Sequence, residues 1–389
     1  MEQLLSSNLK LGITAGGQLG KMLIQEASKW DIITYVLDAN EDCPAGRLAS
    51  HYVKGSNTDY ESVYQFGKLV DILTFEIENV NVKALKRLKS EGHRIAPAPE
   101  ILELIQDKGL QKNFYKENNI PSSPYQLYET PQAVLKGLES GEIHYPFVQK
   151  LREGGYDGRG VAVIKDKSDL DKLLTGASLV EDKVDIDKEI SVIVARNKKG
   201  EIKCFPPVEM LFDPKSNQVD KIICPSAISK EQSEKARHRA SQIIEMLDME
   251  GLLAIEFFID SKGRVLVNEM APRTHNSGHH TIESTISSQF EQHLRAVLNL
   301  PLGSTKLKQP SVMLNIVGDE GYEGPVKYEG ITESLAIEGV KIHLYGKKLT
   351  RPFRKMGHIT ILASTLEEAI NKADKVKQLI KVKSWEKNQ

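Results

Sequence analysis

The first hundred residues alternate short apolar runs with helix-like segments, and this alternation constrains the fold more than any other feature. The apolar runs cover residues 9–16, 32–39, 51–55 and 71–78. Segments of helical pattern lie between them, the first over 19–28. Strands that alternate with helices are typical of βαβ units, so the pattern predicts a parallel sheet. Pro97 and Pro99 end the pattern, since proline interrupts regular structure.

The rest of the chain divides into a longer central region and a shorter last region. Helices are expected over 100–118, 230–249 and 283–298, and strands over 147–151, 161–164, 190–195 and 253–259. Asn299, Pro301 and Gly303 follow the last of these helices and indicate a boundary. The final region is β-rich and closes with a helix over 366–382. We therefore expect an α/β and α+β protein with domains at 1–99, 100–299 and 300–389.

Charge and composition narrow the class of function. Lys and Arg number 52, Asp and Glu 53, and the formal net charge is −1. Binders of nucleic acid or of anionic membranes normally carry a basic excess, so we expect neither partner. The chain start lacks a signal-peptide pattern, and no apolar run reaches about 18 residues. Cys43, Cys204 and Cys224 lie far apart, which predicts buried free thiols and a cytoplasmic protein.

A glycine-rich turn, Ala15-Gly16-Gly17-Gln18-Leu19-Gly20, joins the first strand to the first helix, and Asp38 ends the second strand. This spacing is close to the dinucleotide fingerprint GxGxxG, in which a later acid holds a ribose. Ala15 replaces the first glycine, however, and N–H groups at a helix start bind the phosphates of many ligands. Three interpretations stay open: a phosphorylated substrate, which we favour, a nicotinamide cofactor, or a tight turn alone.

A second loop, Gly154-Gly155-Tyr156-Asp157-Gly158-Arg159-Gly160, contains four glycines between two predicted strands. A hairpin turn needs only one or two glycines. A backbone without Cβ atoms can approach a ligand closely and offer N–H groups to phosphate oxygens. The loop therefore predicts a flap over a ligand. Lys150, on the preceding apolar strand, is either a residue at the edge of the sheet or, as we favour, a phosphate ligand.

A predicted hairpin presents two carboxylates. Its β-rich runs cover 253–260 and 264–270. If Lys262-Gly263 forms a two-residue loop, the register sets Glu256 opposite Glu269 on one face of the hairpin. The alternative is a slipped register with both acids in solvent.

Directly opposed side chains have Cβ atoms about 4.5 to 5.5 Å apart, and like charges so placed are destabilising. A divalent cation between Glu256 and Glu269 would remove that cost. Two carboxylates, phosphate oxygens and the amide of Asn268 form the hard oxygen set that suits Mg²⁺ in nucleotide sites. The hairpin therefore predicts a magnesium site.

The segment after this hairpin, 271–280, is rich in polar groups and contains three histidines. A zinc site is one interpretation, but no carboxylate or thiol completes a ligand spacing. We favour anion recognition by Arg273 and His275.

The run Arg351-Pro352-Phe353-Arg354-Lys355 places three cations in five positions. They repel one another unless an anion lies nearby, and Pro352 limits how far they can separate. The run is either a solvated basic surface or, as we favour, an anion site.

Together these motifs resemble the ATP-grasp superfamily and, within it, the N5-carboxyaminoimidazole ribonucleotide synthetases of purine biosynthesis. The resemblance covers essentially the whole chain. It rests on the motifs at Gly17–Met22, Phe75–Val80, Gly154–Gly160, Asn268–His279 and Arg351–His358. The related formate-dependent glycinamide ribonucleotide transformylases are similar in outline, but their motif after the metal carboxylate differs from His275-Asn276-Ser277-Gly278.

The resemblance implies an ATP-grasp fold with an N-terminal Rossmann-like parallel-sheet domain (the pre-ATP-grasp domain) and a small β-rich C-terminal domain. It also implies a homodimer that uses ATP and Mg²⁺. The implied reaction joins bicarbonate to 5-aminoimidazole ribonucleotide, gives ADP, phosphate and the N5-carbamate, and passes through carboxyphosphate.

The resemblance also assigns residues. Those implied in nucleotide binding are Lys108, Lys150, Gly154, Gly155, Tyr156, Asp157, Gly158, Arg159, Gly160, Glu181, Asp182, Lys183, Val184, Glu189, Phe212, Asn268 and Glu269. Those implied to hold the ribonucleotide are Gln18, Leu19, Glu76, Arg273, His275, Asn276, Arg351, Arg354 and Lys355. Catalytic roles are implied for Tyr156, Asp157, Arg159 and Lys355, and Mg²⁺ ligation for Glu256 and Glu269. Phe212 is a departure, since many relatives carry a polar side chain or histidine there.

Two functions of other classes remain as alternatives. The first glycine turn alone would fit a nicotinamide-dependent oxidoreductase, which a nicotinamide fluorescence titration would reveal. A nucleotide-binding module without catalysis would keep the glycine flap but show no turnover.

Overall fold

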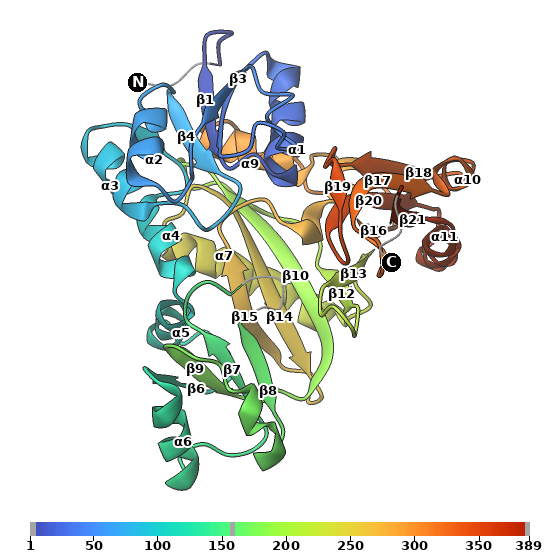
Figure 1. Cartoon of the computed structure of the whole chain (residues 1–389). Coiled ribbons are helices and arrows are strands. Elements are labelled where there is room, and N and C mark those ends of the chain that lie inside the picture. The colour runs from blue at the N-terminus through green and yellow to red at the C-terminus, as the bar shows by residue number, and fades with distance from the viewer. Residues whose placement is uncertain (1–4, 156–159, 386–389) are drawn as a thin grey trace.

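The computed structural model describes residues 5–155 and 160–385 (Figure 1). Tyr156, Asp157, Gly158 and Arg159, which the sequence assigns to the flap, lie outside the described residues. No helix among the described residues is long and apolar enough to cross a membrane.

The N-terminal part is a parallel sheet, as predicted. Its five strands lie in the order β3-β2-β1-β4-β5, and the short β5 is one strand more than the four expected. Helices cover both faces, so β1 is apolar at consecutive positions instead of alternating. Its elements are β1 (Lys10–Thr14), α1 (Gln18–Ala27), η1 (Ser28–Trp30), β2 (Ile33–Asp38), β3 (His51–Lys54), α2 (Tyr60–Gly67), β4 (Ile72–Phe75), α3 (Val82–Ser90) and β5 (Arg94–Ile95).

A small antiparallel sheet in the order β6-β9-β7-β8 follows, next to α5 and α6 (Figure 1). The elements of this region of the chain are α4 (Pro99–Gln106), α5 (Lys108–Glu117), β6 (Tyr125–Tyr128), α6 (Pro131–Glu139), β7 (Phe147–Leu151), β8 (Val161–Ile164), η2 (Lys167–Lys172) and β9 (Ser178–Asp182). The expected helix over 100–118 is wrong in one respect, because it is two helices. Asp107 has extended backbone angles and accepts hydrogen bonds from the Gly109 and Leu110 N–H groups, so it ends α4 and caps α5.

A larger sheet connects the central and C-terminal parts, because β13 pairs with β16. Its main order is β15-β14-β10-β12-β13-β16-β20-β18, with β11 on β10. The strands are β10 (Ile186–Arg196), β11 (Ile202–Cys204), β12 (Val208–Phe212), β13 (Val219–Cys224), β14 (Gly251–Asp260), β15 (Val265–Ala271), β16 (Ser311–Val317), β18 (Val340–Leu344) and β20 (Lys355–Leu362).

The remaining elements pack on this sheet or extend it. A three-stranded sheet, β19-β17-β21, lies in the C-terminal part. These elements are α7 (Lys230–Met246), η3 (Asn276–Gly278), α8 (Thr281–Ser284), α9 (Gln289–Val297), β17 (Gly324–Glu329), α10 (Ile331–Leu335), β19 (Leu349–Thr350), α11 (Leu366–Leu379) and β21 (Lys381–Ser384).

Two other expected helices differ from the structure. The helix over 283–298 is interrupted, because the Ser288 hydroxyl accepts from the Glu291 N–H and starts α9 as a new helix. The last helix ends at Leu379, because the following residues form β21 against β17.

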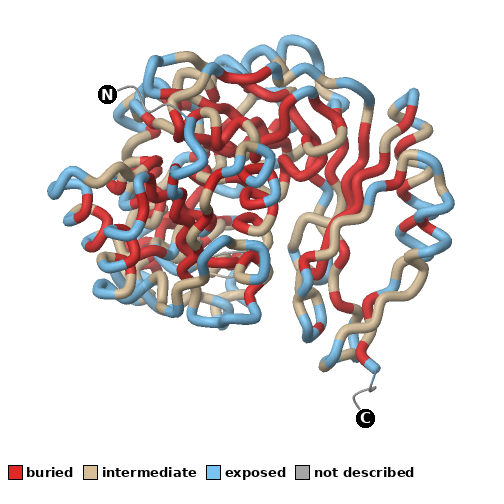
Figure 2. The backbone as a smooth tube through the Cα atoms, turned by 90° about the horizontal axis from the view of Figure 1, so that it is seen from above, coloured by how far each residue is buried: buried red, intermediate tan, exposed pale blue. Residues whose placement is uncertain are grey.

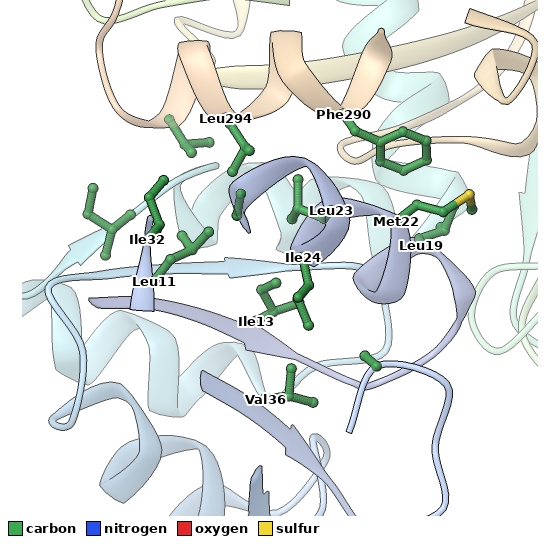
Figure 3. Close-up of a cluster of buried hydrophobic side chains, with 14 of the residues drawn as sticks. Leu11, Ile13, Leu19, Met22, Leu23, Ile24, Ile32, Val36, Phe290 and Leu294 are labelled. Carbon is green, nitrogen blue, oxygen red and sulfur yellow. The ribbon is translucent and has the colours of Figure 1, made fainter. Parts of the chain in front are cut away.

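The N-terminal sheet is fixed to the central part by an apolar interface. Phe290 and Leu294 of α9 face Leu19 and Leu23 of α1 (Figure 3). Buried backbone fills the interior of the molecule and exposed segments line its outside (Figure 2). This interface holds the first glycine turn in a fixed position relative to the segment 275–280.

Candidate active site

The hairpin of β14 and β15 sets Glu256 directly opposite Glu269, as predicted. The predicted two-residue loop is wrong, however, since Asp260 N–H bonds to the Arg264 carbonyl and leaves three residues in the loop. Next to this loop, Phe257 pairs with Val267. If that register continued unbroken, Glu256 would lie opposite Asn268 instead of Glu269. A bulge at Asn268 adds one residue to β15 and brings Glu269 to the face of Glu256.

Lys108 and Lys150, both predicted nucleotide contacts, lie beside this hairpin. Lys108 begins α5 and forms an ion pair with Glu269. Lys150 of β7 donates to Asn268 Oδ1 at 2.9 Å and pairs with Glu181 Oε2 at 2.7 Å. The bulge therefore gives each lysine its own partner on β15.

The pKa of Glu256 is raised and the pKa of Glu269 is lowered, because the two carboxylates have different neighbours. Burial and then Glu269 raise the pKa of Glu256. Lys108 is the largest influence on Glu269 and lowers its pKa. Burial raises the pKa of Glu189 on β10 to about 7, against the effect of Lys150. The three acids influence one another, so the hairpin concentrates negative charge where a cation would bind.

A small cavity lies beside the hairpin and collects most of these groups. It is lined by Lys108, Gln111, Lys112, Lys150, Leu179, Glu181, Asn268 and Glu269. Five of these eight side chains, Lys108, Lys150, Glu181, Asn268 and Glu269, are predicted nucleotide residues, so the structure brings them together from α5, β7, β9 and β15.

The sequence analysis missed Lys112, which is buried in this cavity. Its Nζ lies 2.5 Å from Glu181 Oε1, and the two side chains are only 3% and 4% exposed. Ser123 also donates to Glu181, at 2.8 Å. Burial works to raise the pKa of Glu181, but Lys150 and Lys112 outweigh it and hold the pKa at about 2. The signal was available, because Lys112 lies one helical turn after Lys108 on α5.

The other predicted nucleotide residues lie around this centre. Asp182 ends β9, and Lys183 and Val184 follow it before β10. Gly154, Gly155 and Gly160 are the described ends of the flap, and Gly160 accepts a bond from the Leu151 N–H. Phe212 is half-buried at the end of β12, where it pairs with Val219.

The first glycine turn holds carboxylates. Glu76 accepts from the Gly17 and Gly20 N–H groups, each at 2.5 Å, and Asp38 accepts from the Gly16 N–H at 2.7 Å. Burial raises the pKa of Glu76 to about 7, although the two N–H groups and Arg273 oppose this effect. These three donors of the turn thus position Glu76 and Asp38.

The turn also places Gln18 and Leu19 at the start of α1. Gln18 is its first residue. The Leu19 side chain is buried toward α9 (Figure 3), so only its backbone can face a ligand.

The segment after β15 faces the same region. Arg273 pairs with Glu78 at 2.6 Å, and His275 Nε2 lies 3.7 Å from Glu256 Oε1. Arg273 Nε and Asn276 Nδ2 are buried without an acceptor among the described residues. Buried donors are normally satisfied, so these two are available to the acceptor atoms of a bound ligand or of water.

In the basic run 351–355, the side chains of Arg354 and Lys355 have different surroundings. Arg354 donates to the Leu349 carbonyl at 2.6 Å, and burial followed by Arg351 lowers its pKa. Lys355 begins β20 and is close enough to His279 to lower the pKa of that histidine. The structure therefore brings Lys355 to the segment 275–280.

Known families match the chain in three consecutive segments. Residues 9–106 match the ribonucleotide synthetase preATP-grasp domain, and residues 113–290 match the ATP-grasp domain. Residues 311–372 match the C-terminal domain of phosphoribosylaminoimidazole carboxylase.

Curated relatives are similar over nearly the whole chain. The N5-carboxyaminoimidazole ribonucleotide synthase of Bacillus subtilis is 35% identical over 373 residues, which cover 95% of each protein. The chloroplastic phosphoribosylaminoimidazole carboxylase of Vigna aconitifolia is 37% identical over 366 residues. That match covers 92% of this chain but 64% of the relative, so the chain spans just under two thirds of that protein.

Solved structures agree with these matches. The N5-carboxyaminoimidazole ribonucleotide synthetase from Thermotoga maritima has a TM-score of 0.89 at 44% identity, with 97% of this chain and 99% of that chain covered. The N5-carboxyaminoimidazole synthase from Aspergillus clavatus, in complex with ADP and 5-aminoimidazole ribonucleotide, has a TM-score of 0.86 at 32% identity, with 96% and 98% covered. The predicted ATP-grasp fold is confirmed, and the chain belongs to the N5-carboxyaminoimidazole ribonucleotide synthase family.

Proposed function

We propose that this chain is an ATP-dependent ligase that carboxylates 5-aminoimidazole ribonucleotide with bicarbonate. The products are ADP, phosphate and N5-carboxyaminoimidazole ribonucleotide, an intermediate of purine biosynthesis. The observation that carries the proposal is the bulged hairpin, which sets Glu256 and Glu269 face to face beside Lys108. Two relatives support the proposal, because they are named N5-carboxyaminoimidazole ribonucleotide synthase and synthetase. They match the chain at 35% and 44% identity over nearly its full length.

The nucleotide half of the site is built for phosphoryl transfer. Lys108 and Lys150 would neutralise charge on the phosphates, and the loop 154–160 would cover them. Glu256 and Glu269 fit a Mg²⁺ ion, since two opposed carboxylates among buried acids are an oxygen set that needs a cation. When bound there, Mg²⁺ supplies positive charge to the phosphate oxygens.

The ribonucleotide half faces the N-terminal sheet. Arg273 and Asn276 offer buried donors without acceptors among the described residues, and Lys355 adds a cation from β20. Glu76 and Gln18 lie at the first glycine turn. These groups suit a ligand with a ribose and a phosphate, as in the Aspergillus clavatus complex with 5-aminoimidazole ribonucleotide.

The reaction follows from these two halves. A bicarbonate oxygen attacks the γ-phosphorus, and the bond to ADP breaks as carboxyphosphate forms. Carboxyphosphate then releases phosphate and transfers its carboxyl group to the exocyclic amine, which loses a proton. Carboxyphosphate is labile, so a flap that excludes water would direct it to the amine.

ADP release with and without 5-aminoimidazole ribonucleotide tests the proposal. We expect ADP to form at a rate that depends on both the ribonucleotide and bicarbonate. Nucleotide binding without turnover would indicate a binding module, and a nicotinamide fluorescence change would indicate an oxidoreductase.

Lys355→Ala should weaken binding of the ribonucleotide more than binding of ATP. The expected loss is on the order of 1.5 to 3 kcal/mol, the value of a charge-assisted hydrogen bond. Both dissociation constants should be measured by calorimetry, with Lys341→Ala on the exposed face of β18 as the control. An equal loss for ATP, or no loss for the ribonucleotide, would contradict the assignment.

Gly154→Val should raise the Michaelis constant for ATP and release ADP without carboxylation. Gly154 has φ +75° and open space around it, so the valine is strained by backbone angles alone. Gly141 also has φ +75° and open space, in the turn after α6, so Gly141→Val is a matched control. Uncoupled hydrolysis is measured as the ratio of ADP to carboxylated product. The same ratio in both variants would show that the flap does not protect the intermediate.

We also propose that the enzyme works in the cytoplasm, where thiols stay reduced. Cys43, Cys204 and Cys224 are all buried and free, which supports this location. The expected homodimer stays a prediction, and sedimentation equilibrium would test it.

A further inference from the structure

Three histidine rings, two of them fully buried, pack against one another outside the groups that the proposed reaction uses. The ring centroids of His358 and His343 lie 4.4 Å apart with an angle of 7° between planes. The ring centroid of His358 also lies 4.6 Å from that of His279, with a tilt of 32° between the planes. His358 and His279 are 0% and 1% exposed. We call these three side chains the histidine stack.

The histidine stack joins two parts of the molecule. His343 and His358 face each other across β18 and β20, whereas His279 follows η3 in the central part. Each ring also has a polar partner. These contacts are His343 Nε2 to Glu283 Oε1 at 2.7 Å, His358 Nδ1 to the Tyr345 hydroxyl at 3.1 Å, and His279 Nδ1 to Gln289 Nε2 at 3.2 Å. Because Glu283 and Gln289 belong to α8 and α9, the stack clamps the C-terminal strands onto those helices.

The N-terminal part reaches the same place. Lys21 of α1 donates to the Leu344 carbonyl at 2.7 Å, at the end of β18. Tyr345 packs in the apolar cluster that contains Leu19 and Phe290. All three parts of the chain therefore meet at the histidine stack.

The spacing along the chain connects the stack to the ribonucleotide half of the site. His358 follows Lys355 by three residues, and His279 follows Asn276 by three residues. In a regular strand, residues three apart face opposite sides of a sheet. Register on β20 shifts between Gly357 and Lys355, so that one extra residue turns Lys355 to the face of His358.

The two fully buried rings of the stack, His358 and His279, are uncharged. Burial is the main cause that lowers the pKa of His358 and of His279 well below the usual range. These two neutral rings pack without counter-ions of their own and add no positive charge beside Lys355. His358 contacts His343 and His279, and its Nδ1 bonds to the Tyr345 hydroxyl, so these contacts can fix the strand that carries the lysine.

We propose that His358 is a positioning residue for the ribonucleotide site, which acts by holding Lys355 of β20 in register with Asn276 of η3 through the histidine stack. This inference rests on the proposed function, because it takes Lys355 and Asn276 to contact the ribonucleotide. It assigns His358 no contact with substrate.

The test compares His358→Ala with His358→Phe, which keeps a flat ring between the two other histidines. Ile361→Ala is the matched control, because Ile361 is a buried residue of the same strand and packs in the C-terminal core. Dissociation constants for 5-aminoimidazole ribonucleotide and ATP are measured by calorimetry, together with kcat and thermal stability. If His358→Ala does not fold, the same dissociation constants are measured for His343→Phe.

We expect His358→Ala to weaken ribonucleotide binding at least tenfold and ATP binding less than twofold, with kcat at saturation reduced less than the affinity. His358→Phe and His343→Phe should each retain affinity within threefold of the wild type. Equal losses in His358→Ala and Ile361→Ala, or equal losses for both ligands, would overturn the proposal. The proposal would also be overturned if either Phe variant bound the ribonucleotide as weakly as His358→Ala does. A wild-type protein without ribonucleotide-dependent ADP release would instead refute the proposed function, and the positioning role with it.

Discussion

Glu269→Gln is expected to abolish ATP turnover while the protein stays folded. The change removes one of two opposed carboxylates and the ion pair to Lys108. Loss of one preorganised charge at a reacting centre costs about 10² to 10³ in kcat, and loss of a metal ligand adds to that. The free energy of unfolding should change little, since relief of repulsion with Glu256 offsets the lost ion pair.

The measurement is steady-state ADP release at saturating substrates, with circular dichroism as the check on folding. Glu250→Gln is the control, because Glu250 also forms an ion pair, with Arg94 at 3.4 Å, and lies just before β14 at the end away from the hairpin loop. That variant should keep normal turnover. Near-normal ADP release by Glu269→Gln at ordinary Mg²⁺ would contradict the metal assignment.

Glu181→Gln should lower the free energy of unfolding by about 3 to 5 kcal/mol at pH 7, the usual cost of breaking a buried ion pair. Lys112 would lose its carboxylate partner in a site where its side chain is 3% exposed and where burial already lowers its pKa. The pKa of Glu181 is about 2 in the folded protein, below its value of about 4.3 in an unfolded chain. The stabilisation is therefore complete above pH 4.3 and is lost as pH falls toward 2.

Urea unfolding at pH 7 and at pH 3 measures this effect, and the difference between wild type and Glu181→Gln should shrink at the lower pH. Adding Lys112→Met to the variant should recover part of the loss, because the uncompensated charge is removed. Equal stability of wild type and Glu181→Gln at pH 7 would show that the buried ion pair contributes nothing.

The hairpin shows how far sequence reasoning extends. It predicted Glu256 opposite Glu269 correctly, but from a two-residue loop that the structure does not contain. Asp260 accepts hydrogen bonds from Lys262 and Arg264 N–H groups and so lengthens the loop by one residue. The bulge at Asn268 restores the register. Two unpredicted shifts of one residue cancelled, since alternating patterns fix which face is buried but locate neither loops nor bulges.

The parallel sheet of the N-terminal part was predictable, because strands that alternate with helices are typical of βαβ units, whereas its strand order was not predicted. The break at Asp107 was not, because the apolar pattern runs on through α4 and α5 and only the local capping bonds separate them. The contact of Lys112 with Glu181 joins residues 69 positions apart, and no local pattern encodes such a pair. The sequence therefore located the site, whereas its internal ion pairs needed the tertiary structure.

The most direct test of the proposed reaction follows oxygen and carbon from bicarbonate. Bicarbonate labelled with ¹⁸O and ¹³C is supplied with ATP, Mg²⁺ and 5-aminoimidazole ribonucleotide, and the products are analysed by NMR and mass spectrometry. We predict that ¹⁸O appears in the released phosphate and ¹³C in the N5-carbamate, with one carbamate formed per ADP. ADP release with no ¹⁸O in the phosphate, or with no labelled carbamate, would contradict carboxylation through carboxyphosphate.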